Sequence, residues 1–456
     1  MKNKKFKIVL INPPRFQPVD PYDFPEYPCI SLAYLAACIQ EVVICIDAKY
    51  DRINFEQLEK RIKNIDSIDI VGITSMTHSI FDAHYAVKIV KKHHPNAKAI
   101  IGGCHVTACP KQTLQAYNLF DIAVISEGEI TFPEIVSALK NNHDIQGIKG
   151  ICYRKDNNVI LTQPRPFIKD IDKIPEPAWH LFSKINKTLP VLTTRGCPYK
   201  CNFCMRVLGN IVRFRSPTHV INELKNLINK YGVKKIYFQD ETFTINKNRL
   251  TTILNMMIEE KLNDKIEWWV QTRVDSVDIE ILYLMKKAGC VDIGFGIESG
   301  NTIILNNSGK NITKQQAIQA VNNAKKVGLN VYTYFIFGHP NETISQIKDT
   351  IRFASKLNAY SAVFGMMVPY PGTKIREIAL NGKGGYVSIS DNWNDYGKNV
   401  GHPLELKNIP KKTLIRFQLL AYCYFYLTNF RIVDFLKLFL SNTKTILSIL
   451  SRFRKL

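Results

Sequence analysis

The segment TRGCPYKCNFCMR (194–206) contains three cysteines in a stretch of eight residues. They are Cys197, Cys201 and Cys204, with the spacing C-x3-C-x2-C. Three thiolates in one loop can bind three irons of a cubane 4Fe–4S cluster, which leaves the fourth iron without a protein ligand. Structural zinc is the main alternative, but it needs four ligands, and no second C-x2-C pair follows in the sequence. The spacing therefore favours an iron–sulfur cluster with one open coordination position.

The composition is that of a globular protein. The chain has 456 residues, 46% of them hydrophobic and 22% charged, so two or three domains are expected. A short apolar run that ends in Pro13-Pro14 reads as a first strand rather than a signal peptide, and we expect a cytoplasmic protein. The net charge of +22 is spread along the chain without the basic stripe of a nucleic-acid binder, so no nucleic acid is expected as a partner.

Short apolar strands alternate with amphipathic helices from residue 6 to about 142. The predicted strands are 6–13, 42–48, 69–76, 97–104 and 120–128. This alternation predicts a parallel sheet covered on both faces, a doubly wound, Rossmann-like α/β domain over residues 1–148. Ligands of such sheets bind beyond the carboxyl ends of the strands. Residues 149–185 read as a hairpin that turns at 156–158, followed by a proline-rich linker.

A second alternating pattern begins near residue 186. Its predicted strands are 191–196, 234–241, 267–274, 291–298, 330–337 and 361–369. Six βα units over 186–380 predict a partial parallel barrel, with its chemistry at the carboxyl ends of the strands. Because the three cysteines follow the first of these strands, they are expected on that face. Residues 381–456 are expected to form a C-terminal helical region.

The cysteine loop, C-x3-C-x-F-C after the first strand of a six-unit barrel, resembles that of the radical S-adenosylmethionine (radical SAM) enzymes. In that family the open iron binds the methionine moiety of SAM, and the reduced cluster cleaves SAM to a 5′-deoxyadenosyl radical. The resemblance implies that the three cysteines are the catalytic cluster ligands. It also implies a SAM-binding set: Phe203, Asp240, Glu241, Arg273 and Glu298. An ordinary buried ion pair would explain Arg273 and Glu298 nearly as well. The sequence Gln239-Asp240-Glu241 stands where Gly-Gly-Glu is commoner, a departure usual in the cobalamin-type subgroup.

The first domain is similar to that of the cobalamin-binding radical SAM subgroup. The motifs GGCHVT (102–107) and SEGEITF (126–132) precede the cysteine loop, as they do in that subgroup. The similarity implies cobalamin as a third cofactor, placed against Ser75, Met76, Thr77, Gly102, Gly103, His105, Glu127, Gly128 and Glu129. The motif Asp-x-His-x-x-Gly, which supplies an axial histidine in other cobalamin proteins, is absent, so no histidine ligand to cobalt is predicted.

The resemblance implies two reaction outcomes. The first is methylation of an unactivated carbon, in which one SAM methylates cobalamin and a second yields the radical. The second is ring cyclisation or oxidation, as in the anaerobic magnesium-protoporphyrin ester cyclase. A rival of another class is a non-catalytic electron-transfer or cobalamin-carrier protein, which would not need the polar residues at the strand ends. A methylthiolating enzyme acting on RNA is disfavoured, because no second set of three cysteines is found in the first domain.

The expected partners follow from the same resemblance. They are a small-molecule or lipid-like substrate and an electron donor such as flavodoxin or ferredoxin. The segment 413–456 is apolar, aromatic and basic, with Asp434 as its one acidic residue against seven Lys or Arg. Helices of this composition can lie in a membrane interface, here the inner face, or can close the open side of the barrel.

Overall fold

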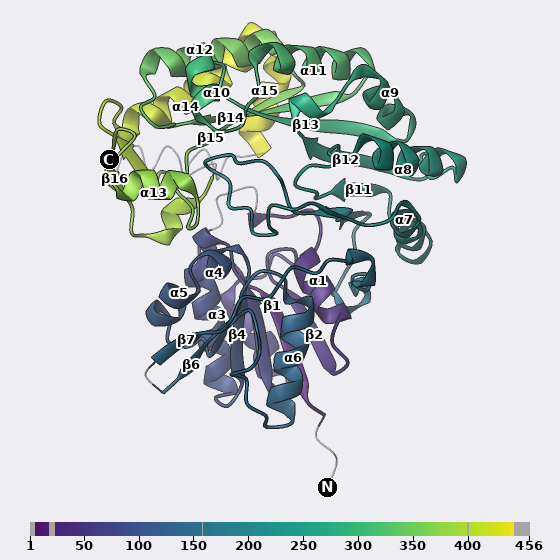
Figure 1. The fold of residues 1–456 in the computed structure, drawn as a ribbon, viewed down its shortest axis with the longest axis vertical. Helices are drawn as coiled ribbons and strands as arrows, with labels where there is room; N and C mark the ends of the chain where they lie inside the picture. The colour runs from purple at the N-terminus through teal and green to yellow at the C-terminus, as the bar shows by residue number, and fades with distance from the viewer. Residues whose placement is uncertain (1–4, 18–22, 157, 399–400, 442–456) are drawn as a thin grey trace. The chain divides into compact units, whose positions relative to one another are not determined.

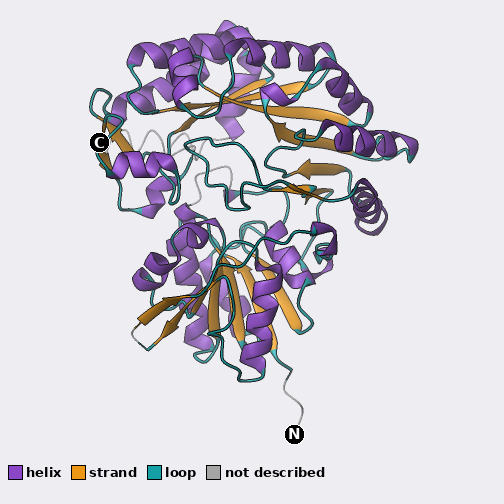
Figure 2. Cartoon of the chain, viewed as in Figure 1, coloured by secondary structure: helices purple, strands orange, loops and turns teal. Residues whose placement is uncertain are grey.

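The computed structural model describes residues 5–17, 23–156, 158–398 and 401–441. The chain forms two compact units, each with its own core (Figures 1 and 2). The first unit comprises Met1–Asn186 and Met205–Gly209, and the second comprises Lys187–Cys204 and Asn210–Leu456. The short segment that directly follows Cys204 therefore belongs to the first unit, while the three cysteines belong to the second.

The first unit is built on a seven-stranded sheet with the order β2-β1-β3-β4-β5-β6-β7. The pairs among the first five strands are parallel, which confirms the predicted doubly wound domain. The centre of the sheet is fully buried, as the 0% exposure of Ile8, Val9 and Leu10 shows. The strands are β1 (Lys7–Asn12), β2 (Val42–Asp47), β3 (Ile70–Thr74), β4 (Lys98–Gly102), β5 (Ile122–Val124), β6 (Ile151–Lys155) and β7 (Asn158–Leu161).

Helices cover both faces of this sheet (Figure 2). They are α1 (Ile30–Ala37), α2 (Phe55–Lys63), α3 (Ile80–His93), α4 (Cys104–Ala108), α5 (Pro110–Ala116) and α6 (Gly128–Lys140), with single-turn 3-10 helices η2 (Thr77–Ser79), η3 (Ile171–Lys173) and η4 (Trp179–Leu181). Local sequence explains where such helices begin. Helix α2 begins with a reciprocal capping box between Asn54 and Gln57, and it buries Leu58 and Ile62.

The hairpin predicted over 150–163 is present as β6 and β7, but it extends the first sheet rather than belonging to a linker. Strand β6 pairs antiparallel with β5, and β7 pairs antiparallel with β6. The pairing explains why Ile151, Cys152 and Tyr153 are buried. The sheet therefore ends in two antiparallel strands at this edge.

The second unit contains a six-stranded parallel sheet with the order β15-β14-β13-β12-β11-β8. Each strand lies beside its neighbour in the sequence, as expected for an open (βα)6 barrel. The strands are β8 (Thr188–Val191), β11 (Lys235–Phe238), β12 (Glu267–Thr272), β13 (Cys290–Glu298), β14 (Asn330–Phe337) and β15 (Ser361–Met366). The first strand lies earlier than the predicted 191–196, because Thr193 and Thr194 leave the sheet to bond with Asp240.

Helices line the outer face of this sheet, where α8, α9, α11 and α12 are seen in Figure 1. They are α7 (Pro217–Tyr231), α8 (Lys247–Glu259), α9 (Ile279–Lys287), α10 (Thr302–Asn307), α11 (Lys314–Lys326), α12 (Ile344–Leu357) and α13 (Lys374–Leu380), with 3-10 helix η5 (Val274–Ser276). After β8 the chain forms a two-stranded antiparallel pair of β9 (Thr194–Arg195) and β10 (Arg213–Phe214). This pair encloses the sequence that carries the three cysteines.

The C-terminal region is not helical throughout. Strands β16 (Tyr386–Ile389) and β17 (Leu404–Leu406) form an antiparallel pair that was not predicted, with 3-10 helix η6 (Trp393–Tyr396) between them. Helices α14 (Lys411–Thr428) and α15 (Ile432–Ser441) follow. The Gln418 amide of α14 donates to the Phe364 carbonyl of β15 at 2.7 Å, so α14 packs beside the edge strand. The rest of the predicted helical region, 442–456, lies outside the described residues.

Within the described ranges, no helix is both long enough and apolar enough to cross a bilayer.

Candidate active site

The three cysteines lie in the loop after β8, at the carboxyl edge of the parallel sheet. They take part in no disulfide. Cys197 and Cys201 are half-buried and Cys204 is exposed. The Cys204 amide donates to the Cys201 carbonyl at 3.2 Å, which closes a turn with Phe203 half-buried inside it. The Cys197 sulfur lies 3.7 Å from Oγ1 of Thr242, a residue that follows β11.

Asp240, at the end of β11, anchors the chain that leads into the cysteine loop. Its carboxylate accepts the backbone N–H of Thr193 at 2.8 Å and the hydroxyls of Thr193 and Thr194 at 3.0 and 2.9 Å, together with the Thr194 N–H. Burial raises the pKa of this carboxyl, and the hydrogen bonds from Thr194 and Thr193 act against that rise. Its oxygens are therefore engaged in holding the loop, while the neighbouring Glu241 is exposed.

Arg273, at the end of β12, contacts the cysteine loop through Tyr199. Its guanidinium carbon lies 3.6 Å from the centre of the Tyr199 ring, a cation–π contact. The same guanidinium donates twice to Asp275, at 2.8 Å each, and once to the Lys310 carbonyl at 2.6 Å. Arg273 thus links the residue between the first two cysteines to the segment after α10.

That segment, 307–310, lies directly against the cysteine loop. The Asn202 backbone N–H donates to the Ser308 carbonyl at 2.9 Å, and the Asn202 side-chain amide donates to the Asn307 carbonyl at 2.7 Å. Gly309 has a φ of +72°, and a Cβ there would lie 2.8 Å from the Lys200 carbonyl oxygen. A glycine is required at this position because both the backbone conformation and the close approach exclude a side chain.

Glu298, at the end of β13, forms a buried ion pair with Lys310. The Lys310 ammonium lies 2.5 Å from Oε1 of Glu298, and both side chains are less than a tenth exposed. Burial alone would raise the pKa of Glu298, but the Lys310 ammonium lowers it. Burial likewise raises the pKa of Cys201, against the charges of Lys310 and Arg273, which favour the thiolate. Sequence reasoning missed Lys310, because an isolated lysine in a loop carries no recognisable pattern.

The turn after β14 carries two buried titratable groups. Glu342 accepts the backbone N–H of Gly338 at 2.6 Å and that of His339 at 3.2 Å, both on Oε2. Burial raises the pKa of Glu342 to about 8, against those two hydrogen bonds. Burial lowers the pKa of His339 to about 4, although the nearby charge of Glu298 opposes this. Both side chains are therefore neutral near pH 7.

The loop fits an iron–sulfur cluster better than a single metal ion. Among the residues that the structure describes, no three His, Cys, Asp or Glu side chains converge as a single ion requires. A cubane cluster does not need such convergence, since each thiolate binds a different iron. Three thiols on one loop, with the cations Lys310 and Arg273 beside Cys201, also match the negative charge that a thiolate-bound cluster carries. Cys197, Cys201 and Cys204 would hold it.

In the first unit, most of the predicted cobalamin set lies at the carboxyl edge of three adjacent strands, β3, β4 and β5. Ser75, Met76 and Thr77 follow β3, and Met76 is 46% exposed although it is apolar. A Cβ on Gly102, at the end of β4, would meet no atom within 4 Å, so the backbone there faces open space. A flat ring system could approach this edge closely, which fits a corrin.

Members of the set also make contacts within the protein. His105 is buried in α4 with its ring 3.6 Å from the Cys109 sulfur. Glu127 is buried and accepts the Ile168 N–H at 2.8 Å. Gly103 has a φ of +107°, and a Cβ there would lie 2.5 Å from the Ser75 carbonyl oxygen. The contacts of His105, Glu127 and Gly103 support the loops at this edge. Gly128 and Glu129 follow Glu127, are half-buried and begin helix α6.

A buried ion cluster lies beside the ends of β1 and β3, where the strand order of the first sheet reverses. Arg15 contacts Asp82 and lies 3.2 Å from Asp23, and Lys49 and His78 each lie 3.8 Å from Asp23. Burial alone would raise the pKa of Asp23, but the hydrogen bond from His78 and the charges of Lys49 and Arg15 lower it to about 2. The sequence did not predict this cluster, because its members come from separate segments of the chain.

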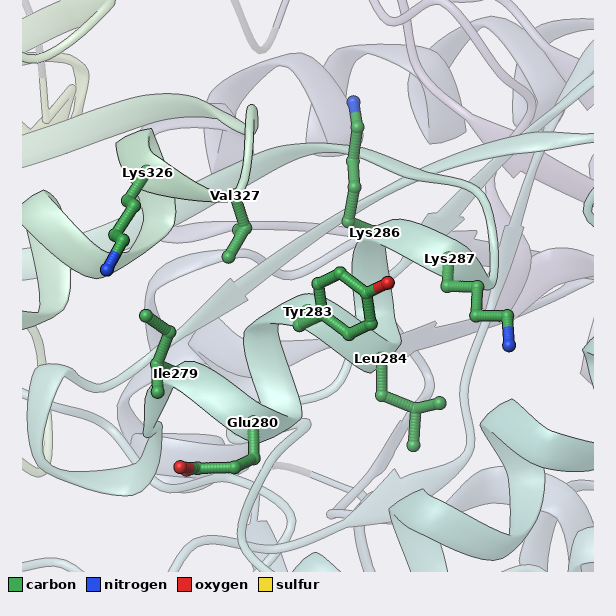
Figure 3. A pocket seen from close by; sticks show the side chains of 8 residues that line it. All are labelled: Ile279, Glu280, Tyr283, Leu284, Lys286, Lys287, Lys326 and Val327. Atoms are coloured by element: carbon green, nitrogen blue, oxygen red, sulfur yellow. The ribbon is translucent and has the colours of Figure 1, made fainter.

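A groove of about 920 Å³ lies on the outer helices of the second unit (Figure 3). It is lined by residues of α9 and the end of α11: Ile279, Glu280, Tyr283, Leu284, Lys286, Lys287, Lys326 and Val327. None of the predicted site residues lines it. The candidate active site is therefore the carboxyl edge of the sheet and not this groove.

Both units of the chain match known protein families. Residues 191–354 match the radical SAM superfamily, and residues 25–136 match the B12 binding domain. The first range contains the cysteine loop and the ends of β11 to β14, and the second contains most of the first sheet. The two ranges correspond to the two units of the structure.

Three known proteins illustrate the similarity. An uncharacterized methyltransferase of Pyrococcus horikoshii is 37% identical over 93% of this chain and 93% of its own length. An anaerobic magnesium-protoporphyrin IX monomethyl ester cyclase of Cereibacter sphaeroides is 29% identical over 77% of this chain and 60% of its own length. The radical S-adenosylmethionine methyltransferase TsrM of Kitasatospora setae, solved with cobalamin and a [4Fe-4S] cluster, has the same fold with a TM-score of 0.72 and 16% identity, over 93% of this chain and 89% of TsrM. This chain belongs to the cobalamin-binding radical SAM enzymes.

Proposed function

We propose that this enzyme methylates an unactivated carbon of a small-molecule or lipid-like substrate. The observation that carries the proposal is the cysteine loop at the carboxyl edge of the barrel sheet, braced by Asp240, Arg273 and the segment 307–310. The methyltransferase of Pyrococcus horikoshii, similar along nearly the whole chain, supports methylation as the outcome. When bound, the cluster and SAM supply a 5′-deoxyadenosyl radical, and cobalamin supplies the methyl group.

The residues of the second unit would hold the cofactors in place. Cys197, Cys201 and Cys204 would bind the cluster, and Phe203, in the same turn, would contact SAM. Glu241 is exposed at the sheet edge and is the better candidate of the Asp240–Glu241 pair to bind the SAM amino group, because Asp240 is engaged with Thr193 and Thr194. Arg273, which is paired with Asp275, and Glu298, which is paired with Lys310, would orient SAM.

The residues of the first unit would hold cobalamin at the carboxyl edge of β3, β4 and β5. Ser75, Met76, Thr77, Gly102 and Gly103 are proposed to lie under the corrin. The remaining members of the set are His105, in α4, and Glu127, Gly128 and Glu129, at the start of α6. Buried His105 and Glu127 would act by shaping the loops that contact the corrin. A one-electron donor such as flavodoxin or ferredoxin completes the system.

The proposal is tested with anaerobically reconstituted protein, SAM carrying a deuterated methyl group, and an extract of the source cells. Labelled product together with S-adenosylhomocysteine and 5′-deoxyadenosine is the expected result. Deoxyadenosine without labelled product would instead support a cyclase or another radical reaction, the alternative suggested by similarity to the magnesium-protoporphyrin ester cyclase. The Cys201→Ala variant should form no deoxyadenosine. Cleavage of SAM at the wild-type rate by that variant would contradict cleavage at a cluster bound by this loop, and a wild-type protein that holds a cluster but cleaves no SAM would favour the non-catalytic, electron-transfer class.

The C-terminal helices suggest where a lipid-like substrate would be met. Apolar side chains on α14, on α15 and between them are exposed, and Phe430 is 90% exposed. The others are Leu420, Tyr424, Leu427, Ile432, Val433 and Leu436. Residues 437–456 of the sequence add five Lys or Arg and no Asp or Glu. Exposed apolar side chains next to cationic sequence are typical of a surface that binds anionic lipid.

Sedimentation with vesicles tests this peripheral contact. The protein should bind vesicles of phosphatidylcholine with phosphatidylglycerol more strongly than phosphatidylcholine alone, and added salt should weaken the binding. Phe430→Asp should reduce it. Leu380→Asp, at an exposed position of α13, is the matched control and should leave it unchanged. Equal sedimentation of the wild type and the Phe430 variant would exclude this surface as the contact.

A further inference from the structure

We propose that Lys310 is a positioning residue that raises the reduction potential of the cysteine-bound cluster, by presenting a buried positive charge to Cys201. The inference deepens the proposed function and rests on it, because it assumes that Cys197, Cys201 and Cys204 hold an iron–sulfur cluster. Lys310 belongs to no motif by which the site was predicted. Its positioning role is inferred from its contacts in the structure.

The backbone places Lys310 against the cysteine loop. The carbonyls of Asn307 and Ser308 both accept hydrogen bonds from Asn202, the residue after Cys201. At Gly309 the two segments approach so closely that a Cβ would lie 2.8 Å from the Lys200 carbonyl. The Lys310 carbonyl accepts the Arg273 guanidinium at 2.6 Å, so its backbone is held on the other side as well. The position of Lys310 relative to Cys201 is thus fixed by the main chain.

The ammonium group is also fixed and sheltered from water. Its side chain is 8% exposed, and Nζ lies 2.5 Å from the Glu298 carboxylate. Gly296 makes room for this pair, because a Cβ there would lie 2.5 Å from Nζ and 2.7 Å from Oε1 of Glu298. Glu298 adopts a φ of +73°, a conformation that a non-glycine residue adopts only under the constraint of its surroundings. The fold therefore holds the Lys310–Glu298 ion pair in a buried position.

The contacts of residues 307–309 with Lys200 and Asn202 hold Lys310 close to the cysteine loop. Its positive charge favours the Cys201 thiolate, as does that of Arg273, whereas the negative charges of Cys204 and Glu298 oppose it. The charge of Arg273 is offset by its two hydrogen bonds to Asp275. When the electron donor passes one electron to the cluster, the cluster gains one negative charge. A buried cation stabilises that added charge, since low-dielectric surroundings screen it little.

The experiment measures the midpoint potential of the cluster in the reconstituted, SAM-free protein by a reductive titration followed by electron paramagnetic resonance. Lys310→Met should lower the potential, so that the reduced-to-oxidised ratio at a given potential falls about tenfold, or ~59 mV for a one-electron couple. Lys310→Arg keeps the charge and should restore most of the wild-type potential. Lys314→Met removes an exposed lysine four residues away and should leave the potential unchanged.

The outcomes separate this inference from the proposed function. A Lys310→Met protein with a full cluster and a wild-type or higher potential overturns the role of Lys310 alone. If that variant fails to hold a cluster, Lys310→Met with Glu298→Gln removes both charges and leaves no buried carboxylate unpaired. Its potential should still lie below that of the wild type, and an equal or higher value overturns the inference. A wild-type protein that binds no cluster overturns both the inference and the proposed function.

Discussion

Asp240 and Glu241 are neighbours in the sequence with different surroundings. Asp240 is 4% exposed and accepts hydrogen bonds from the amides and hydroxyls of Thr193 and Thr194. Glu241 lies on the surface at the sheet edge. The first carboxylate therefore holds the chain that leads into the cysteine loop, and the second is exposed to solvent. The sequence motif assigned Asp240 and Glu241 the same SAM-binding role, and their different surroundings are seen only in the structure.

Asp240→Asn should destabilise the second unit and reduce cluster loading. The amide replaces one acceptor oxygen with a donor, so at least one buried N–H or hydroxyl loses its partner, at about 1–3 kcal/mol for each lost bond. Thermal unfolding and iron content per protein measure the two effects. The matched control is Glu241→Gln, which should leave the unfolding midpoint unchanged and weaken SAM binding. Wild-type stability in the Asp240 variant would contradict the anchoring role.

Glu342 gives a prediction about pH. Because its folded pKa of about 8 lies above the ordinary value of 4.5, the folded state binds more protons than the unfolded state between those values. The stabilisation from this group is full below about pH 4.5 and is lost as pH rises through about 8, with a slope of at most about 1.4 kcal/mol per pH unit. His339, with a folded pKa of about 4, changes stability only below its ordinary 6.5.

Measurements above about pH 6.5 therefore isolate Glu342 from His339. Glu342→Gln keeps an acceptor oxygen for the Gly338 and His339 amides but cannot ionise. The thermal midpoint of the wild type should fall relative to that of the variant between about pH 6.5 and 9, while the difference stays constant if the carboxyl does not titrate in this range. Parallel curves for the two proteins would show that the Glu342 pKa is not raised.

At the scale of elements, the barrel strands act through the turns at their carboxyl ends. The segment 307–310 after α10 is the clearest case, since it contacts the cysteine loop through Asn202 and through the close approach of Gly309. The cysteine loop contains no helix or strand between Gly196 and Gly209, so its shape depends on such neighbours. We therefore expect cluster loading to respond to changes in the bracing segment that touch no cysteine.

Gly309→Ala should lower cluster loading more than it lowers stability. A methyl group there would press on the Lys200 carbonyl, and the φ of +72° adds about 1 kcal/mol of backbone strain. Gly232→Ala is the matched control, because Gly232 has a similar φ of +64° but a Cβ there would meet no atom within 4 Å. Iron and sulfide content after reconstitution measures the loading. Equal loading in the two variants would show that the close approach is unimportant.

The same elements show what could be predicted from the sequence. Continuous apolar runs identified the eleven parallel strands of the two main sheets, with an error only in the bounds of β8, because buried parallel strands need apolar side chains on both faces. The hairpin of β6 and β7 was predicted, but not its place in the first sheet. The β8 error arose because Thr193 and Thr194 continue a strand-like sequence but bond to Asp240 instead of the sheet. Short, polar β16 and β17 carry no such run and were missed.

At the scale of the whole molecule, the sequence predicted the two α/β units, but not the buried charges within them. Arg15 and Asp82, like the cysteine loop and the segment that carries Lys310, lie far apart in the sequence, and their contacts depend on the folded chain. The two units have separate cores, and the cysteines lie in one while the whole predicted cobalamin set lies in the other. The stability of each cofactor site should therefore follow the unit that contains it.

A pair of glycine variants tests this division. Gly72→Ala in β3 would place a Cβ 2.6 Å from Leu10 Cδ2 in the first core, and Gly294→Ala in β13 would place one 2.9 Å from Tyr334 Cε2 in the second. Each should cost about 1–3 kcal/mol through overpacking in its own unit. In urea titrations of the loaded enzyme, Gly72→Ala should shift the loss of cobalamin absorbance to lower urea, and Gly294→Ala should shift the loss of cluster absorbance. If either variant shifts both transitions equally, the two units unfold as one, and the stability of each cofactor site does not follow its own unit.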